Sequence, residues 1–212
     1  MALPHSLDPL AYPPRFQFGQ TGSPCRGKAA CTDTCLQMLI EYWKEKTVSL
    51  STIRRISKNP DTCTGNNAIE VKRVIEYFNL PYIYVSDIDT LYIAKKVAIA
   101  PVFLGVGYAK YPNKSTVCGP IKAEVGGRSD CNFRGAHAVL ALKYQNHLSS
   151  TGTLLHHDFI MRDPDHASAA RPWKPNYDRI TLNQLDRTMK ALVTDTAWTH
   201  TFAFVPTRRK SL

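Results

Sequence analysis

Residues 31–43 read Cys-Thr-Asp-Thr-Cys-Leu-Gln-Met-Leu-Ile-Glu-Tyr-Trp and indicate where the first long helix of this chain begins. Thr32, Asp33 and Thr34 are residue types that start helices. Apolar side chains then recur at helical spacing, at Leu36, Leu39, Ile40 and Trp43. Cys31 is therefore expected at the N-terminus of the helix, where the helix dipole favours a thiolate over a thiol. A thiolate there is a candidate nucleophile, although a cysteine that only packs in the core is the common alternative.

The rest of the chain changes from helical patterns to strand patterns. A short helix is expected from Ser51, and Asn67 with Glu70 resembles a capping box that opens a helix running to about Asn79. Strands are expected over 81–85, 101–108, 136–144, 154–162 and 198–205, and further helices over 90–98 and 182–192. Helices followed by closely connected strands indicate an α+β fold with an antiparallel sheet.

The domain organisation follows from length and local composition. A chain of 212 residues suits a single domain. Residues 1–30, rich in Pro, Gly and Ser, are expected to form an extended N-terminal arm, residues 31–207 the domain, and residues 208–212 a basic C-terminal tail. The polar segments 110–134 and 164–179 are expected as loops bordering a functional site, because long loops inside compact domains are often functional.

Composition narrows the class of protein. With 43% hydrophobic and 21% charged residues, the chain is typical of a globular protein. We find no apolar run that reaches the roughly 20 residues needed to cross a bilayer, and residues 1–14 lack the basic-then-apolar pattern of a signal peptide. We therefore expect no membrane span and a cytoplasmic or virion-associated location.

The formal net charge of +10 could attract nucleic acid, anionic cell wall or an acidic partner. The basic residues are spread along the chain, however, and the one dense cluster is Arg208, Arg209 and Lys210. Neither a recognition motif nor a stripe of basic and aromatic residues accompanies the charge, so nucleic-acid binding is disfavoured. A solvated basic surface and tail explain the charge more simply.

Six cysteines raise the question of disulfides and metals: Cys25, Cys31, Cys35, Cys63, Cys118 and Cys131. Without a secretion signal we expect mostly free thiols, although Cys118 and Cys131 bracket a Gly-rich loop and could pair under oxidising conditions. Cys35, one helical turn after Cys31, is expected in the core. The absence of a CxxC motif disfavours a zinc knuckle, and a zinc site of Cys31, Cys35 and a histidine is the remaining metal alternative.

His137 and Asp163 are the candidates for a base and its partner. His137 lies in Gly135-Ala136-His137-Ala138-Val139, where a strand is expected to begin, and this position suits a base that reaches a substrate. Asp163 ends the next strand and precedes Pro164, and there it could accept a hydrogen bond from the far ring nitrogen of His137. A strand histidine is usually a core residue and an Asp before Pro usually starts a turn. The prediction of a base and its partner therefore rests on His137 and Asp163 occurring together.

The order of these three residues resembles that of papain-like cysteine peptidases, most closely the branch that trims double-glycine leaders from bacteriocin precursors, and its free-standing relatives. In that family the nucleophile segment reads roughly Cys-Gly-x-Ala-Cys-Leu-x-Met, and residues 31–38 match it at Cys31, Cys35, Leu36 and Met38. Residues 135–139 approximate the family's Gly-His-x-Val strand start, and Asp163-Pro164 reproduces its Asp-Pro pair. The resemblance covers about residues 17–205 and implies a papain-like fold with N-terminal helices packed on an antiparallel sheet.

The resemblance also implies roles. Cys31 would be the nucleophile, His137 the base and Asp163 the residue that orients the base, and neither a metal nor an organic cofactor is needed. The family carries a Gln shortly before the cysteine that helps to bind the oxyanion. Gln20 is the candidate here, with Gln17 in reserve and the backbone N–H of Cys31 as the second donor. Thr32 and Thr34 replace the family's Gly and Ala beside the nucleophile.

The substrate and the activity remain open at this point. A leader peptide and a peptidoglycan peptide are both compatible with the resemblance, and the basic charge would help against an anionic cell wall. The alternative is a catalytically weak or inactive peptidase-fold module in a larger assembly such as a phage virion or tail. In that case the arm formed by residues 1–30 would dock into an assembly partner.

Overall fold

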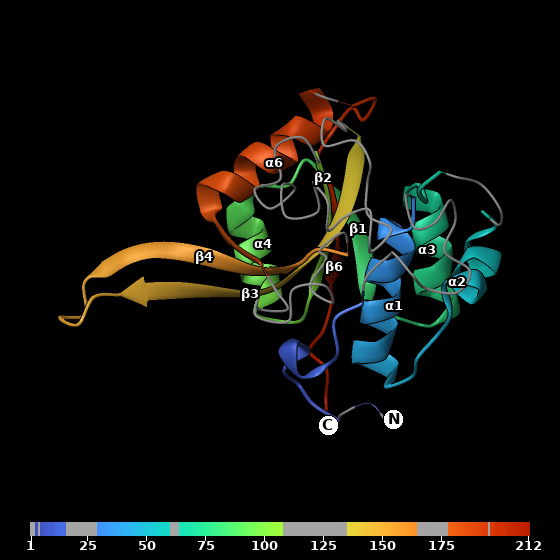
Figure 1. Ribbon diagram of the computed structural model, residues 1–212, viewed down its shortest axis with the longest axis horizontal. Coiled ribbons are helices and arrows are strands. Elements are labelled where there is room, and N and C mark those ends of the chain that lie inside the picture. Colours follow the sequence, from blue (N-terminus) through green and yellow to red (C-terminus); the bar gives the residue numbers. More distant parts are fainter. Residues whose placement is uncertain are drawn as a thin grey trace, which may run out of the picture.

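A computed structural model describes residue 3 and residues 5–15, 29–59, 64–107, 135–164, 178–194 and 196–212. Within these ranges the chain forms N-terminal helices followed by a six-stranded antiparallel sheet, as the sequence predicts for an α+β fold. Figure 1 shows α1, α2 and α3 on one side of the sheet and α4 and α6 on the other.

Helix α1, Cys31–Lys44, lies between the sheet and the helices α2 and α3 in Figure 1. It begins one residue earlier than the sequence suggests: Ala30 is the N-cap, so Cys31 is the first residue of the helix and residues 32–34 lie in its first turn. Almost its whole surface is buried, including the carboxyl-bearing residues Asp33 and Glu41. The helix ends at Glu45, whose φ of 53° is left-handed.

Helices α2, Leu50–Ser57, and α3, Ala68–Tyr77, pack beside α1. The Ser49 side chain caps α2 by accepting a hydrogen bond from the N–H of Thr52. The capping box predicted for α3 is present, because the Asn67 side chain accepts from the N–H of Glu70 and the Glu70 carboxylate accepts from the N–H of Asn67.

The sheet has the strand order β1-β6-β2-β3-β4-β5, and each neighbouring pair is antiparallel. Its strands are β1 Tyr82–Ser86, β2 Val102–Gly107, β3 Ala136–Leu148, β4 Leu154–Arg162, β5 Asp178–Thr181 and β6 Phe202–Pro206. Strand β5 begins at the end of the segment 164–179 that the sequence assigns to a loop, and β6 begins four residues later than expected.

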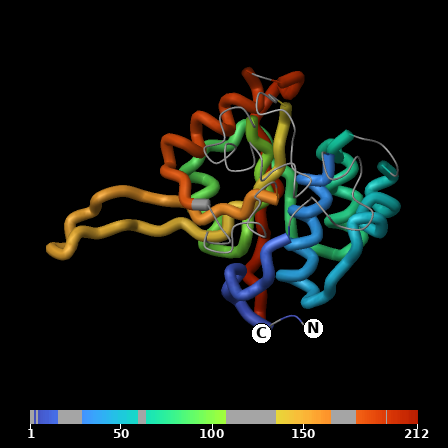
Figure 2. The backbone as a smooth tube through the Cα atoms, viewed as in Figure 1, coloured from blue at the N-terminus to red at the C-terminus, as the bar shows by residue number. Residues whose placement is uncertain are grey.

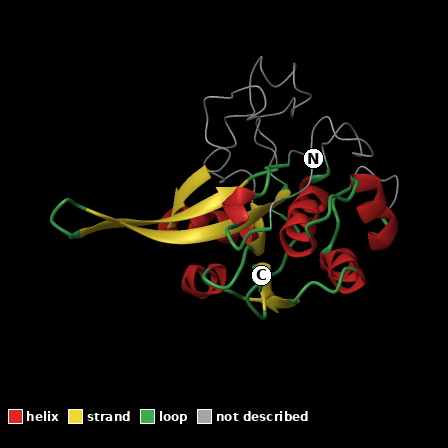
Figure 3. Ribbon diagram, turned by 90° about the horizontal axis from the view of Figure 1, so that it is seen from below, coloured by secondary structure: helices red, strands yellow, loops and turns green. Residues whose placement is uncertain are grey.

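Both faces of the sheet are buried, which explains why its central strands read as almost unbroken apolar runs. Alternate residues, such as Phe103, Leu140 and Phe204, pack with the helices α1 to α3. The residues between them pack with α4, Thr90–Val97, and α6, Leu182–Thr194. Figure 3 shows helices on both sides of the sheet in a perpendicular view.

The N- and C-terminal segments lie together against α1, at the same end of the molecule in Figure 2. Tyr12 packs edge-on against Tyr42 of α1, and Arg15 forms an ion pair of 2.7 Å with the buried Glu41. Residues 5–15 contain a short 3-10 helix, Pro9–Ala11. This part of the expected arm therefore packs against α1 of the same chain.

Lys210 also differs from the expected solvated tail, because it is buried. Its ammonium group donates to the Ser6 carbonyl at 3.1 Å and to the Tyr12 hydroxyl, and it pairs with Glu45 at 2.9 Å. Arg208 and Arg209 are exposed.

Strands β3 and β4 continue past the other strands as a long two-stranded hairpin, which extends away from the rest of the molecule in Figures 1 and 3. Strand β3 runs to Leu148, four residues beyond the predicted end at Tyr144. Over the part of the chain that the structure describes, we find no helix with the length and apolar character needed to cross a bilayer.

Candidate active site

The thiol of Cys31 belongs to the first residue of α1, which lines a cavity of about 220 Å³. Only 6% of the residue is exposed. His137 lines the same cavity from the start of β3. The fold therefore brings together two side chains that are 106 residues apart in the sequence (137 minus 31).

His137 and Asp163 form a buried pair beside this cavity. The Nε2 atom of His137 lies 2.7 Å from Oδ1 of Asp163, and the side chains are 0% and 3% exposed. His137 is the second residue of β3, opposite Val106 of β2, whereas Asp163 directly follows the last residue of β4. Because β3 and β4 are antiparallel neighbours, the start of one strand meets the end of the other. All three predicted residues therefore lie in one place.

The surroundings of His137 favour its imidazolium form. Burial of the ring lowers its pKa, but the charge of Asp163 and the hydrogen bond to its carboxylate act in the opposite direction, and contact with the Cys31 thiol adds to them. The result is a pKa raised to about 10. An imidazolium held next to a thiol at a helix N-terminus favours the thiolate, which is the nucleophilic form of cysteine.

A buried ion pair supports the chain on both sides of Cys31. Nε of Arg54, in α2, donates to Oδ2 of Asp33 at 2.8 Å, and both side chains are almost completely buried. Arg54 also donates to backbone carbonyls at 2.9–3.1 Å, those of Ala29, Asn59 and Thr64. One guanidinium thus joins α2, the first turn of α1, the residue two before the cysteine and the segment that leads to α3.

Asn66 completes this network from the cavity wall. Its amide donates to the other Asp33 oxygen at 2.6 Å, and Asn66 itself lines the cavity. Burial raises the pKa of Asp33 to about 6, although Arg54 and Asn66 lower it. At neutral pH the group is therefore an ionised carboxylate that needs both partners. No local sequence pattern predicts this pair, because Asp33 and Arg54 are 21 residues apart.

The remaining cavity walls are mostly apolar. They include Val71 of α3 and a group of aromatic and aliphatic side chains from the sheet, from α6 and from the segment after it: Phe103, Leu192, Trp198 and Phe202. Gly105 allows the Phe202 ring to lie there, since a Cβ at residue 105 would be 2.4 Å from that ring. An apolar wall next to a thiol can take up an apolar side chain of a bound peptide.

Other predicted features have mixed outcomes. Cys35 is completely buried in the core, as expected, and burial, the largest cause, raises the pKa of its thiol. Gln20, Gln17, the loop 110–134 and most of the loop 164–179 lie outside the described residues, as do the other cysteines: Cys25, Cys63, Cys118 and Cys131. The oxyanion role of Gln20 and the pairing of Cys118 with Cys131 thus stay predictions.

Comparison with known proteins identifies the fold. No protein-family model matches this chain, and no curated protein matches it significantly by sequence. A structure described as that of a C39-like peptidase from Bacillus anthracis aligns over 93% of this chain and 96% of its own, with a TM-score of 0.52 and 12% sequence identity. The chain therefore has the papain-like α+β fold of the C39 peptidases, in agreement with the resemblance of its sequence motifs.

A second solved structure gives a similar alignment. It is the peptidase domain of Streptococcus ComA, a bi-functional ABC transporter involved in a quorum-sensing pathway. The alignment covers 86% of this chain and 96% of that domain, with a TM-score of 0.47 and 13% identity.

Proposed function

We propose that this protein is a cysteine peptidase that cleaves peptide bonds with Cys31 as nucleophile, His137 as base and Asp163 as the residue that orients the base. The observation that carries the proposal is the 2.7 Å contact between His137 Nε2 and Asp163 Oδ1 beside the cavity that Cys31 lines. This contact engages one ring nitrogen and leaves the other, Nδ1, as the nitrogen that exchanges a proton with the thiol.

The proposed reaction follows from these positions. The Cys31 thiolate attacks the carbonyl carbon of the scissile peptide bond, while the proton of the thiol resides on His137. As the tetrahedral intermediate collapses, the C–N bond breaks and His137 gives its proton to the leaving amine. His137 then takes a proton from water, the hydroxide attacks the thioester, and the carboxylate product leaves with the Cys31 thiol restored. Asp163 stabilises the imidazolium each time it forms.

The oxyanion requires hydrogen-bond donors beside Cys31. Backbone N–H groups in the first turn of a helix have no acceptor within the helix, because the residues that would supply one precede it. The N–H of Cys31, at the first position of α1, is therefore our proposed backbone donor. Gln20 is the proposed side-chain donor, by its position upstream of the cysteine.

The proposed substrate is a peptide with an apolar side chain near the scissile bond, because apolar residues dominate the cavity wall near Cys31. Leader peptides and peptidoglycan peptides both remain candidates within this class. They differ in size and apolar character, so a panel containing both types separates them.

Cleavage of such a panel, followed by mass spectrometry, tests the proposed activity. The wild type is expected to release fragments, whereas Cys31→Ala is expected to release none. Cys35→Ala serves as the matched control, because Cys35 lies one turn along the same helix in the core. Equal cleavage by the wild type and Cys31→Ala would exclude Cys31 as the nucleophile. No cleavage of any peptide would favour the alternative of an inactive module.

A further inference from the structure

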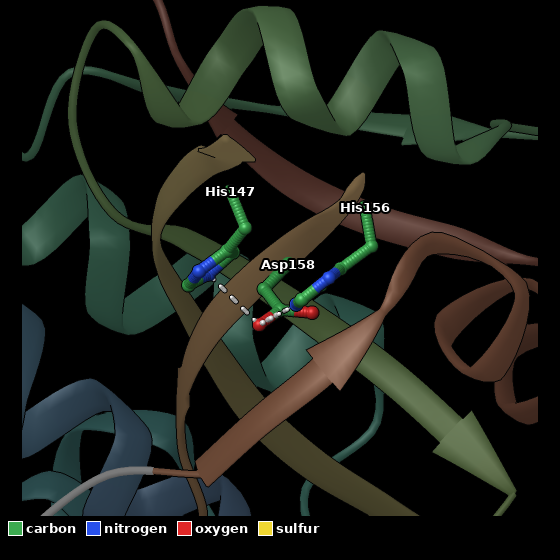
Figure 4. A group of neighbouring side chains, drawn as sticks. All are labelled: His147, His156 and Asp158. Carbon is green, nitrogen blue, oxygen red and sulfur yellow. Dashed lines mark ion pairs between the residues drawn. The ribbon is translucent and has the colours of Figure 1, made fainter. Parts of the chain in front are cut away.

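Three metal-ligating side chains meet on one face of the β3–β4 hairpin. His147 lies directly opposite His156 in the strand pairing, and Asp158, two residues after His156, points to the same side. Figure 4 shows the three side chains turned toward one another. Among the described residues, this is the one group of three His, Cys, Asp or Glu side chains whose ligand atoms all lie within 4.8 Å of one another.

The distances in this group suit a tetrahedral metal ion. Oδ2 of Asp158 lies 3.0 Å from Nε2 of His147 and 3.4 Å from Nε2 of His156. Zinc binds such atoms at about 2.0–2.1 Å, so two ligands of a tetrahedral site are separated by about 3.3 Å. Both separations are close to this value.

The environment of Asp158 also points to a cation. Its side chain is only 9% exposed, and the described side chains within ion-pair distance of it are the two imidazoles. A buried carboxylate is normally paired with positive charge or bound to a metal. The two imidazole rings are stacked, with centroids 4.3 Å apart and an interplanar angle of 8°, so their Nε2 atoms approach the same oxygen from adjacent positions.

His147 has a second neighbour that competes with a cation. The guanidinium of Arg179, on β5, lies 3.3 Å from the same Nε2 atom that faces Asp158. One ring nitrogen cannot both donate to a carboxylate and accept from a guanidinium. At most one of these two contacts of His147 Nε2 is therefore a hydrogen bond. Arg179 is exposed. Its positive charge nevertheless opposes a cation at this position.

We propose that His147, His156 and Asp158 bind one zinc-type divalent cation. Two imidazole nitrogens and one carboxylate oxygen suit Zn²⁺ and similar transition metals, whereas Mg²⁺ and Ca²⁺ prefer oxygen ligands alone. Three protein ligands leave the fourth position to water. His147 is ten residues along β3 from His137, about 33 Å in an extended strand, so this ion takes no part in chemistry at Cys31.

The ion would stabilise the exposed part of the hairpin. Strand β5 pairs with β4 only over 158–161, so in the described structure residues 154–157 pair with β3 alone. A two-stranded hairpin is marginally stable by itself. Cross-linking the two strands through a metal ion would therefore stabilise the pairing of β3 with β4 in this part of the hairpin. The end of the hairpin exposes Leu148, Leu154 and Leu155.

Zinc binding by the full-length protein tests this site. Chelator-treated protein is titrated with zinc sulfate by isothermal calorimetry, and bound zinc is measured after dialysis. We expect one more equivalent in the wild type than in His156→Ala, and an affinity reduced roughly 10- to 100-fold or more by Asp158→Asn. The matched control is His157→Ala, since His157 points to the opposite face and contacts Asn146 at 2.7 Å. Arg179→Ala is expected to bind zinc more tightly, because it removes a competing positive charge.

A second readout follows the hairpin itself. Proteolysis within the turn 149–153 is expected to slow when zinc is added to the wild type or to His157→Ala, and to be unaffected by zinc in His156→Ala. Circular dichroism identifies any variant that fails to fold. If His156→Ala fails to fold, zinc binding by Asp158→Asn, which keeps the shape of the side chain, is compared with that of the wild type instead. Equal zinc binding by the wild type, His156→Ala and Asp158→Asn would overturn the proposal and assign the zinc to thiols elsewhere. The absence of any zinc binding would also overturn it.

Discussion

At the residue scale, the protonation of His137 connects the geometry of the site to its behaviour with pH. The folded state raises the pKa of this ring to about 10, above its ordinary value near 6.5. A group whose pKa is raised on folding stabilises the folded state fully below its unfolded pKa and loses this effect as the pH rises through the folded pKa. The pair with Asp163 therefore stabilises the protein at neutral pH and ceases to do so near pH 10.

Asp163→Asn tests this link. The amide keeps the shape of the side chain but removes the charge that supports the imidazolium, so the alkaline limit of activity is expected to move to lower pH. We expect kcat/KM at neutral pH to fall by about 100-fold or more.

Equilibrium unfolding provides the corresponding stability measurement. The difference in free energy of unfolding between wild type and Asp163→Asn is expected to be largest near pH 6.5 and to shrink toward pH 10. A difference that does not change over this range would show that Asp163 does not influence the protonation of His137.

At the element scale, the position of α1 depends on a residue in another helix. Arg54 of α2 holds the carbonyls of Ala29 and Thr64 as well as Asp33, and these groups surround the start of α1. Because a guanidinium is planar and donates in several directions at once, a lysine cannot reproduce this arrangement. The network acts on Cys31 through the backbone, which makes Arg54 a positioning residue.

Arg54→Ala is expected to reduce the free energy of unfolding by about 3–5 kcal/mol at pH 7, because it leaves the buried Asp33 carboxyl group without its partner. Arg55→Ala, next in the chain but exposed, is the matched control and should change little. Denaturant unfolding at two pH values checks the mechanism. Asp33 already has a pKa raised to about 6, and loss of Arg54 should raise it further, so the destabilisation should be smaller at pH 5 than at pH 7. Equal losses at both pH values would contradict this explanation.

The elements also show what a sequence can predict. Capping residues and apolar periodicity located α1 to α4 and α6 to within a few residues, because these signals are local. The buried pair of Asp33 and Arg54 and the short strand β5 were missed, because each depends on a partner distant in the sequence. His137 and Asp163 were proposed from the motifs, and their contact follows from the antiparallel pairing of β3 with β4.

At the scale of the whole molecule, the two ends of the chain are joined through Lys210. Its ammonium lies 4.9 Å and 5.1 Å from the ring centroids of Tyr12 and Tyr42, in addition to its polar contacts with Ser6 and Glu45. Net charge and composition predicted a solvated tail, because they do not reveal a buried acceptor site for one lysine. The N-terminal segment 5–15 is consequently held on the domain rather than extended from it.

Lys210→Ala is therefore expected to lower Tm by roughly 5 °C, through loss of buried contacts that link both termini to α1. Arg209→Ala removes the same charge from an exposed neighbour and should leave Tm almost unchanged. Differential scanning calorimetry of the two variants compares them directly. If both substitutions have the same effect, net charge rather than the buried site determines the stability.

The central claim is that Cys31 and His137 act as a catalytic pair, and the most direct test is the rate at which a mild alkylating reagent labels Cys31 across pH, read by mass spectrometry. The pair predicts fast labelling well below the usual thiol pKa of about 8.5, and loss of this fast labelling in His137→Ala. Labelling of Cys31 in the wild type that is no faster than in His137→Ala at every pH would contradict the pair and indicate a peptidase fold that serves as a scaffold.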